Sequence, residues 1–254
     1  MGKEEPGAGG MAWAKFGKEE WGRYFGLVPD EPALPRRIKA LMGASCPIWK
    51  GKKVCETHLL VLVPSTLNSR RMCMNLMAEV MQAPKEGNAC SIRYYWDKMK
   101  AQRGLEGPEA CYWILIAKDI LPRSTNKLYQ DQQALARALQ VELVQPEDIK
   151  LVQGASYLQN SPYKMPTALE MVITMVLWYA STGERLLKET SEEEGGKQSW
   201  TNTRCRDELL HGCPIVVGSF RESGMCVYDY HSCGTDVGGG VVVCMKLDDI
   251  KELK

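Results

Sequence analysis

MPTALEMVITMVLWYASTGERLL, residues 165–187, is the stretch of sequence that decides the fold. Thr167 followed three residues later by Glu170 is a capping box, in which the two side chains each accept from a backbone N–H that the first helical turn leaves unpaired. Gly183 suits the left-handed conformation that closes a helix. The sequence therefore predicts a helix that begins near Thr167 and ends at Gly183.

The predicted helix is apolar on every side. Between Met171 and Ala180 nearly every residue is apolar, so the helix must either be buried in protein or span a membrane. A span needs about 20 apolar residues. This run is much shorter, and Glu170, Glu184 and Arg185 lie at its ends. We therefore expect a helix in the core of the protein and no membrane span.

Two short apolar runs precede this helix, THLLVLV at 57–63 and CYWILIA at 111–117. Runs of this kind are typical of strands that are buried on both faces, as in parallel sheets. Apolar residues at helical spacing predict helices over 72–81, 92–102 and 128–139. The order of strand, helices, strand and helix is that of a crossover unit, so we expect the first two strands to be parallel.

Three further strands are predicted after the helix, PIVVGSF at 214–220, MCVYDY at 225–230 and GVVVCMKL at 240–247. Short turns that contain glycine join them, which favours antiparallel pairing. Together with the first two strands they give a central mixed sheet of about five strands covered by helices. The predicted class is mixed α/β, with α+β as the alternative.

The chain has 254 residues, of which 44% are hydrophobic and 25% are charged, as is ordinary for a folded protein. Residues 1–12 are polar and rich in glycine, and indicate a flexible segment. We expect a single domain over 13–254, with a short helix at KEEWGRYFG, 18–26, and an acidic solvated loop at ETSEEEGGKQS, 189–199.

Charge and cysteine content narrow the classes of function. With 32 basic and 31 acidic residues the net charge is +1, which argues against a nucleic-acid-binding protein and against an electrostatic membrane anchor. The sequence starts without an apolar signal segment, and its ten cysteines include no C-x-x-C pair. We therefore expect reduced thiols and a cytoplasmic protein, while export by a route that needs no signal peptide stays open.

Several stretches together resemble a domain of unassigned function that is found in chlamydia-like intracellular bacteria. They are PKEGNA (84–89), YWILIAKDILPRSTNKLYQDQQAL (112–135), TALE (167–170), TGERL (182–186), WTNTRC (200–205) and PIVVGSF (214–220). The resemblance runs from about Trp13 to the C-terminus. It implies a bacterial protein that acts towards a host cell, and it brings no known activity.

The chain departs from the pattern of that domain at two places. Arg123-Ser124-Thr125 stands where the pattern has Gly-Ser-Arg, and Ser219 replaces a glycine. Cys205 has a counterpart in the pattern, whereas Cys213, Cys226 and Cys233 do not. This difference weakens any mechanism that depends on the later cysteines.

Cys205 is the first candidate for chemistry. It lies between two arginines, and a nearby positive charge lowers the pKa of a thiol. With His58 or His211 as base and Asp207 to orient it, Cys205 could form a thiol-dependent catalytic site. The alternative is a free structural cysteine.

A metal site is the second candidate, because His211 with Cys213 and His231 with Cys233 each form H-x-C. Zinc sites more often have two to four residues between paired ligands, and an unpaired cysteine in a strand is commonly a small buried hydrophobe. We therefore predict no metal. The glycines also fit neither the P-loop nor the dinucleotide fingerprint, and no cofactor is expected.

The third candidate is KDILPRSTNKLYQDQQ, residues 118–133, which leaves a predicted buried strand and enters a predicted helix. Open α/β sheets often bind ligands at this place. The polar residues concentrated there are Asp119, Arg123, Ser124, Asn126 and Lys127. The alternative is that hydroxyl and amide groups of the segment only cap the helix.

No motif in the sequence assigns a reaction. We therefore expect a non-catalytic protein-interaction module of a bacterial effector, with host or bacterial proteins as partners. The alternative is a thiol-dependent hydrolase or transferase that uses Cys205.

Overall fold

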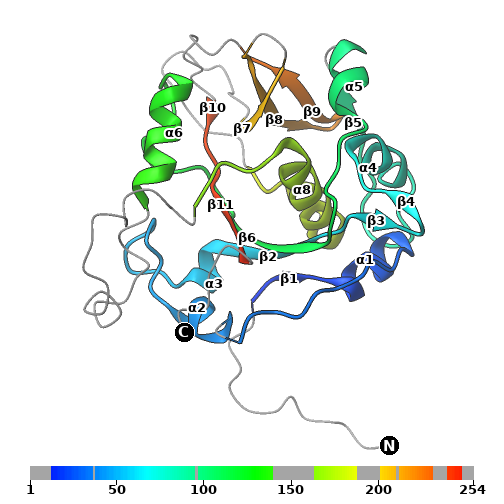
Figure 1. The fold of residues 1–254 in the computed structure, drawn as a ribbon, viewed down its shortest axis with the longest axis horizontal. Helices are drawn as coiled ribbons and strands as arrows, with labels where there is room; N and C mark the ends of the chain where they lie inside the picture. Colours follow the sequence, from blue (N-terminus) through cyan, green and yellow to red (C-terminus); the bar gives the residue numbers. More distant parts are fainter. Residues whose placement is uncertain are drawn as a thin grey trace, which may run out of the picture.

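The computed structural model describes residues 13–36, 38–94, 97–139, 163–187, 201–209, 212–230 and 239–247. Within these ranges the chain forms two sheets with the helix α8, Ala168–Thr182, between them (Figure 1). The predicted flexible segment at 1–12 and the predicted acidic loop at 189–199 lie outside the described residues.

Helix α8 begins and ends where its sequence predicts. The Thr167 N–H donates to Glu170 Oε2 at 2.6 Å, and the Glu170 N–H donates to Thr167 Oγ1 at 3.1 Å, which completes the capping box. Gly183 has φ 72° and its N–H donates to the Tyr179 carbonyl. The bounds of this helix are therefore set by interactions within 20 residues of chain.

The first sheet has the strand order β1–β2–β6–β11, and the second has the order β10–β7–β8–β9–β5. The strands of the first sheet are β1 Lys15–Phe16, β2 His58–Val63, β6 Tyr112–Ala117 and β11 Cys244–Lys246. Those of the second are β10 Gly239–Gly240, β7 Asn202–Glu208, β8 Pro214–Arg221, β9 Gly224–Asp229 and β5 Ile92–Tyr94.

Six shorter helices and a small hairpin surround the two sheets and α8 in the described residues. The helices are α1 Lys18–Phe25, α2 Ile38–Gly43, α3 Val54–Thr57, α4 Met74–Val80, α5 Asp97–Arg103 and α6 Tyr129–Ala138, and the hairpin pairs β3 Thr66–Leu67 with β4 Arg70–Arg71. Helices α1 and α4 contact α8 directly.

The mixed α/β class is confirmed, and the second sheet is a mixed sheet of five strands. Its strands β8 and β9 pair antiparallel, as predicted for 214–220 and 225–230. Strand β7, which was not predicted, pairs antiparallel with β8, and the strand predicted over 240–247 does not join them as an antiparallel neighbour. The prediction that the first two strands are parallel is wrong. Strands β2 and β6 pair antiparallel, from His58 opposite Ala117 to Val63 opposite Tyr112. An apolar run shows that both faces of a strand are covered, but it carries no signal for strand direction.

Two further predictions are corrected in detail. The helix expected over 92–102 is divided into β5, which pairs in parallel with β9, and α5. The strand expected over 240–247 is also divided. Gly240 belongs to β10 and pairs in parallel with β7, whereas β11 pairs antiparallel with β6 in the other sheet. The segment between β10 and β11 thus links the two sheets.

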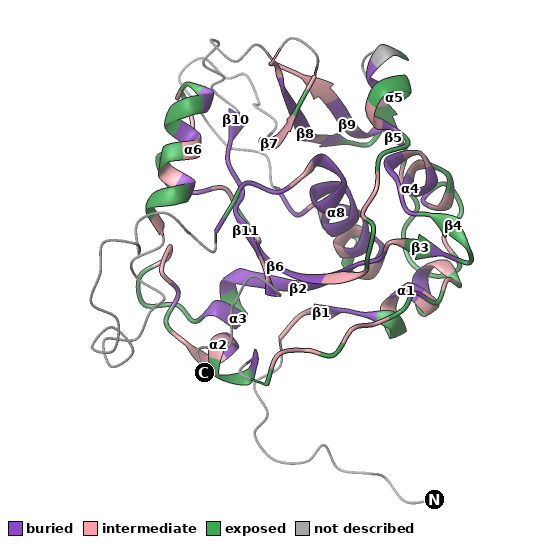
Figure 2. Cartoon of the chain, viewed as in Figure 1, coloured by how far each residue is buried: buried purple, intermediate pink, exposed green. Residues whose placement is uncertain are grey.

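The buried residues of both sheets and of α8 form one continuous hydrophobic cluster. In Figure 2 helix α8 and strands β2 and β6 are largely buried, while α5, α6 and the β3–β4 hairpin expose much of their surface. Among the described helices, none is long and apolar enough to cross a membrane.

The turn at 84–88 packs on the C-terminal end of α8. Gly87 has φ 85°, and a Cβ added to it would lie 2.0 Å from the Ala180 carbonyl oxygen. The N–H of Asn88 donates to the same carbonyl at 3.3 Å, and the Asn88 side-chain amide donates to the Tyr179 carbonyl at 3.3 Å. A residue larger than glycine at 87 therefore displaces the turn from the helix.

We expect Gly87→Ala to lower the free energy of unfolding by about 2 kcal/mol or more, because it adds a backbone clash to a left-handed conformation. Gly51→Ala is the matched control, because Gly51 has φ 79° but open space around its Cβ position. Urea unfolding of both variants measures the difference. If both variants lost the same free energy of unfolding, the close contact between residue 87 and α8 would not contribute to the loss.

Candidate functional site

A β-bulge in β7 brings charged residues to the start of α8. Arg204 pairs with Val216 and Glu208 pairs with Pro214, so the three residues 205–207 of β7 lie opposite the single residue Ile215 of β8. A bulge of this kind redirects side chains and is frequent beside functional sites. We call residues 205–207 the β7 bulge.

Two hydrogen bonds connect the β7 bulge to the start of α8. The Arg206 N–H donates to the Pro166 carbonyl at 2.9 Å, and the Ala168 N–H donates to Asp207 Oδ2 at 2.5 Å. Asp207 thus places a carboxylate at the positive end of the helix dipole, where negative charge is favoured.

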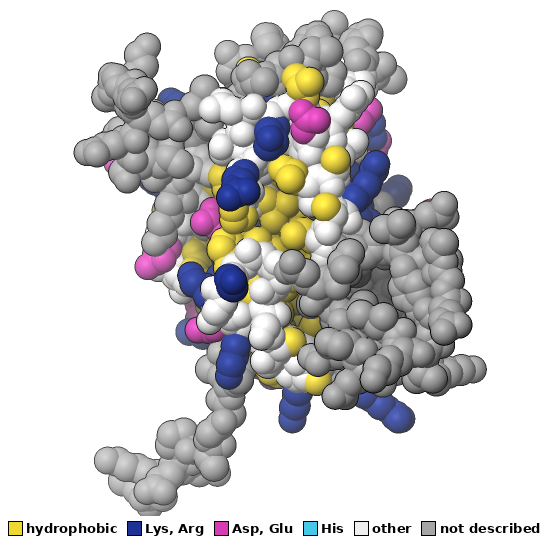
Figure 3. All heavy atoms as spheres, turned by 90° about the vertical axis from the view of Figure 1, so that its left-hand side faces the viewer, with side chains coloured by type: hydrophobic (Ala, Val, Ile, Leu, Met, Phe, Trp, Pro, Cys, Tyr) yellow, Lys and Arg dark blue, Asp and Glu magenta, His cyan; other side chains and the backbone are white. Residues whose placement is uncertain are grey.

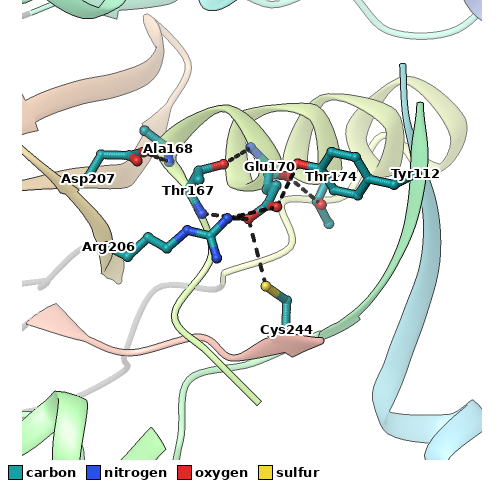
Figure 4. Close-up of polar contacts among 8 residues, drawn as sticks. All are labelled: Tyr112, Thr167, Ala168, Glu170, Thr174, Arg206, Asp207 and Cys244. Atoms are coloured by element: carbon teal, nitrogen blue, oxygen red, sulfur yellow. Dashed lines mark hydrogen bonds and ion pairs between the residues drawn. The ribbon is translucent and has the colours of Figure 1, made fainter. Parts of the chain in front are cut away.

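Glu170 is the centre of a buried polar cluster at this point (Figure 4). Its side chain has no exposed surface. Glu170 Oε1 accepts from the Tyr112 hydroxyl at 2.7 Å and from Arg206 Nη2 at 3.3 Å, while Oε2 accepts from the Thr167 N–H and from the Cys244 thiol at 3.8 Å. The carboxylate therefore links α8 to β6, β7 and β11. Burial and the nearby Glu170 carboxylate raise the pKa of Tyr112.

Beside this cluster lies a cavity of about 580 Å³, which we call the bulge cavity. Its volume is in the range of about 300–1,000 Å³ that is usual for small-molecule sites. The polar side chains that line it are Arg103, Glu106, Glu109, Tyr112, Thr167, Arg206, Asp207 and Lys246. The Lys246 Nζ lies 3.8 Å from the centroid of the Tyr112 ring, within reach of a cation–π interaction.

Asp207 is the predicted site residue that lines the bulge cavity. Burial raises its pKa, while the Ala168 N–H and Arg206 act in the opposite direction. A carboxyl group in this environment takes up a proton more readily than an ordinary aspartate. It therefore combines partial exposure with a perturbed pKa, a combination that is typical of functional sites.

The surroundings of Cys205 argue against its predicted use as a nucleophile. It has no exposed surface, and burial, followed by the negative charges of Asp207 and Glu170, raises the pKa of its thiol well above the usual value. The neighbouring arginine lowers the pKa by a smaller amount. Because the thiolate is the reactive form, both accessibility and ionisation disfavour chemistry at Cys205.

His58 is engaged elsewhere. Its Nδ1 lies 2.9 Å from Thr57 Oγ1 and its Nε2 lies 3.2 Å from the Tyr163 hydroxyl, and its ring has no exposed surface. Burial, together with the Lys118 charge, lowers its pKa to about 4. Both ring nitrogens thus have partners other than Cys205 or Asp207. His211, the other predicted base, lies outside the described residues.

The predicted ligand segment, residues 118–133, forms buried hydrogen bonds with other parts of the protein. Ser124 is fully buried, and its hydroxyl accepts from the Val241 N–H at 3.0 Å. Gln132 Nε2 donates to the Ser124 carbonyl at 2.7 Å, and Arg204 Nη1 donates to Gln132 Oε1 at 3.0 Å and to the Lys127 carbonyl at 2.9 Å. These bonds join α6 to β7 and to the link between the two sheets.

The remaining residues of that segment are peripheral. Asp119 Oδ1 accepts from the N–H of the next residue, while Arg123 and Asn126 are exposed and have φ 65° and 55°. The capping alternative is not seen either, because Leu128 is the N-cap of α6 and makes no side-chain cap.

Sequence reasoning missed Tyr112 and Lys246, which border the bulge cavity, and used Glu170 only as a helix cap. Tyr112 looked like one more residue of an apolar run, and Lys246 like the end of a strand. Their contacts join residues more than 50 positions apart, for which a single sequence holds no signal. The H-x-C pair at 231 and 233 lies outside the described residues, and within the described ranges no three His, Cys, Asp or Glu side chains could hold a metal ion.

We expect Cys205 to be alkylated more slowly than the partly exposed Cys213 and Cys226 at neutral pH, because a buried thiol with a raised pKa is rarely a thiolate. Timed labelling with iodoacetamide followed by peptide mass spectrometry gives the order. Labelling after unfolding in urea is the control for intrinsic differences between the peptides. If Cys205 were labelled first in the folded protein, the thiol-enzyme alternative would regain support.

Neither a scan against protein-family models nor searches of curated proteins and of solved structures gave a match to this chain.

Proposed function

We propose that the chain is a non-catalytic protein-interaction module that binds a partner polypeptide through the side of the molecule on which α6 lies. The observation that carries this proposal is a gathering of apolar side chains in the middle of that side, with Lys, Arg, Asp and Glu side chains around it (Figure 3). Exposed apolar patches with a polar rim are typical of protein-binding surfaces.

Two elements contribute described residues to this side of the molecule. Leu128, at the start of α6, keeps 43% of its surface exposed. A shallow cavity of about 290 Å³ is lined by Gln133, Ala136 and Arg137 of α6 and by Lys164 and Met165 before α8. We call these six residues the α6 face. A cavity of this size receives a single anchoring side chain of a partner.

Burial of the candidate nucleophile and base supports binding over catalysis. Cys205 and His58 are both fully buried, and a group that reacts with substrate must be reachable by it. The bulge cavity is lined by ionic and apolar groups, which are suited to recognition.

The proposed partner is a host or bacterial protein, in keeping with the resemblance to a domain of chlamydia-like bacteria. Basic side chains of the α6 face, Arg137 and Lys164, favour an acidic segment on the partner. Action within a host cell belongs to the same proposal and rests on the resemblance alone.

Photo-crosslinking tests whether a partner protein binds at the α6 face. With p-benzoylphenylalanine at position 128, we expect a discrete covalent adduct in lysate of the source bacterium or of a host cell. The same group at Leu105, which is 66% exposed, is the matched control and should give none. Leu128→Glu should abolish capture of the identified partner, whereas Leu105→Glu should leave it intact. Equal adducts at both positions, or none at position 128, would contradict the proposal.

A further inference from the structure

Charges of both signs line the bulge cavity in equal number. The cations are Arg103, Arg206 and Lys246, and the anions are Glu106, Glu109 and Asp207. A ligand with a single charge would meet as many like charges as opposite ones, whereas a ligand with both charges can match each to its complement. One pair is already satisfied within the protein, because Arg103 Nη1 lies 2.7 Å from the Glu106 carboxylate.

Arg206 has guanidinium N–H donors that Glu170 does not use and that are available to a ligand. Its Nη2 lies 3.3 and 3.5 Å from the two oxygens of Glu170, longer than the roughly 2.7–2.9 Å of a strong charge-assisted hydrogen bond. The side chain is 33% exposed, and a guanidinium carries about five N–H donors in a planar fork. The donors that Glu170 does not use suit a carboxylate, which arginine binds through two parallel hydrogen bonds.

Lys246 supplies a second cation beside the first. Within the described residues it forms no ion pair, and its Nζ lies over the ring of Tyr112. The hydroxyl of the same tyrosine donates to Glu170, which also holds Arg206. The Tyr112–Glu170 contact therefore brings the ammonium of Lys246 and the guanidinium of Arg206 to the same end of the cavity.

Asp207 supplies the complementary anion. It is partly exposed, and its Oδ2 accepts from the Ala168 N–H, which leaves Oδ1 for a ligand. In a regular strand the neighbouring residues 206 and 207 would point to opposite faces. The β7 bulge removes that alternation, so both side chains reach the cavity. Met74, Leu169 and Ile215 add apolar surface.

We propose that the bulge cavity binds a small zwitterion of the α-amino-acid type with an apolar side chain. Its carboxylate lies against Arg206 and Lys246, its ammonium against Asp207, and its side chain against the apolar lining. This site does not use Leu128 or the α6 helix, so it does not depend on the proposed function, although Arg206 lines both cavities.

Calorimetric titration of the full chain tests the proposal with four ligands. L-leucine and L-leucyl-L-leucine carry both charges, N-acetyl-L-leucine lacks the ammonium, and L-leucinamide lacks the carboxylate. We expect saturable binding of leucine or of the dipeptide, and affinity weaker by about tenfold or more for both blocked compounds, because each loses one charged hydrogen bond. Whichever of leucine and leucyl-leucine binds with the higher affinity shows which spacing between ammonium and carboxylate the cavity accepts.

Substitutions at Asp207 and Lys246 test which charged group of the ligand each of these residues contacts. Asp207→Asn keeps an acceptor for the Ala168 N–H, and should weaken leucine about tenfold while leaving N-acetyl-leucine unchanged. Lys246→Met should weaken both, whereas Lys85→Met, at an exposed site elsewhere, should weaken neither. Circular dichroism verifies that each variant is folded. Equal affinity for all four ligands, or no saturable binding up to about 10 mM, overturns the proposal.

Discussion

Replacement of Glu170 by alanine is expected to lower the free energy of unfolding by about 3 kcal/mol. The carboxylate is fully buried and accepts hydrogen bonds from Tyr112, Thr167, Arg206 and Cys244. Its removal leaves the tyrosine hydroxyl and a backbone N–H without acceptors and opens a cavity between the two sheets. Arg206 is partly exposed and regains water, so the loss falls at the lower end of the range for a broken buried ion pair.

Urea unfolding followed by circular dichroism measures this loss. Glu170→Gln keeps one acceptor oxygen, which can serve either Tyr112 or Thr167, and should cost less than the alanine variant, because it preserves the side-chain volume and part of the hydrogen bonding. Glu184→Ala, beyond the exposed end of the same helix, should change stability by less than about 0.5 kcal/mol. If Glu170→Ala were as stable as the wild type, the carboxylate would not be what joins α8 to the sheets.

Acidification is expected to destabilise the protein by about 3 kcal/mol through His58 alone. The pKa of His58 is about 4 in the folded chain, against the ordinary 6.5 of a histidine in the unfolded chain, so the unfolded chain binds a proton first as the pH falls. The contribution is flat above pH 6.5. Between pH 6.5 and about 4 the unfolded chain holds more protons, and stability therefore falls as the pH falls. Below about pH 4 both states are protonated and the loss stops growing.

The difference between wild type and His58→Gln isolates this effect, because the other titrating groups are common to both. Free energies of unfolding should be measured from pH 7 to pH 4. We expect the stability of the wild type to fall more steeply than that of the variant below pH 6.5. Parallel curves would show that His58 is protonated as readily in the folded chain as in the unfolded one.

The bulge cavity was beyond prediction because its residues come from distant parts of the chain. Lys246 ends the last strand, Tyr112 lies in a central strand, and Arg206 and Asp207 lie in a strand that was not predicted. Asp207 was named only as a partner for Cys205. Its position in the cavity depends on the β7 bulge, which no turn residue or periodicity marks in the sequence.

Two departures from the resembled pattern also depend on backbone geometry. Arg123 and Ser219 stand where that pattern has glycine, and they have φ 65° and 44°. The left-handed region favours glycine because other residues place their Cβ close to the backbone there. The sequence shows the substitutions, but only the structure shows what conformation they must adopt.

The sequence by itself determined the ends, the length and the burial of α8, because the Thr167–Glu170 capping box and the left-handed Gly183 act within a few residues of chain. It also determined the mixed class, through short apolar runs between helical segments. Only the tertiary structure decided that β2 and β6 are antiparallel, that α8 lies between two sheets, and that its capping carboxylate meets Tyr112 and Arg206. Those features depend on contacts between distant segments, and the energy of such contacts is set by packing rather than by local pattern.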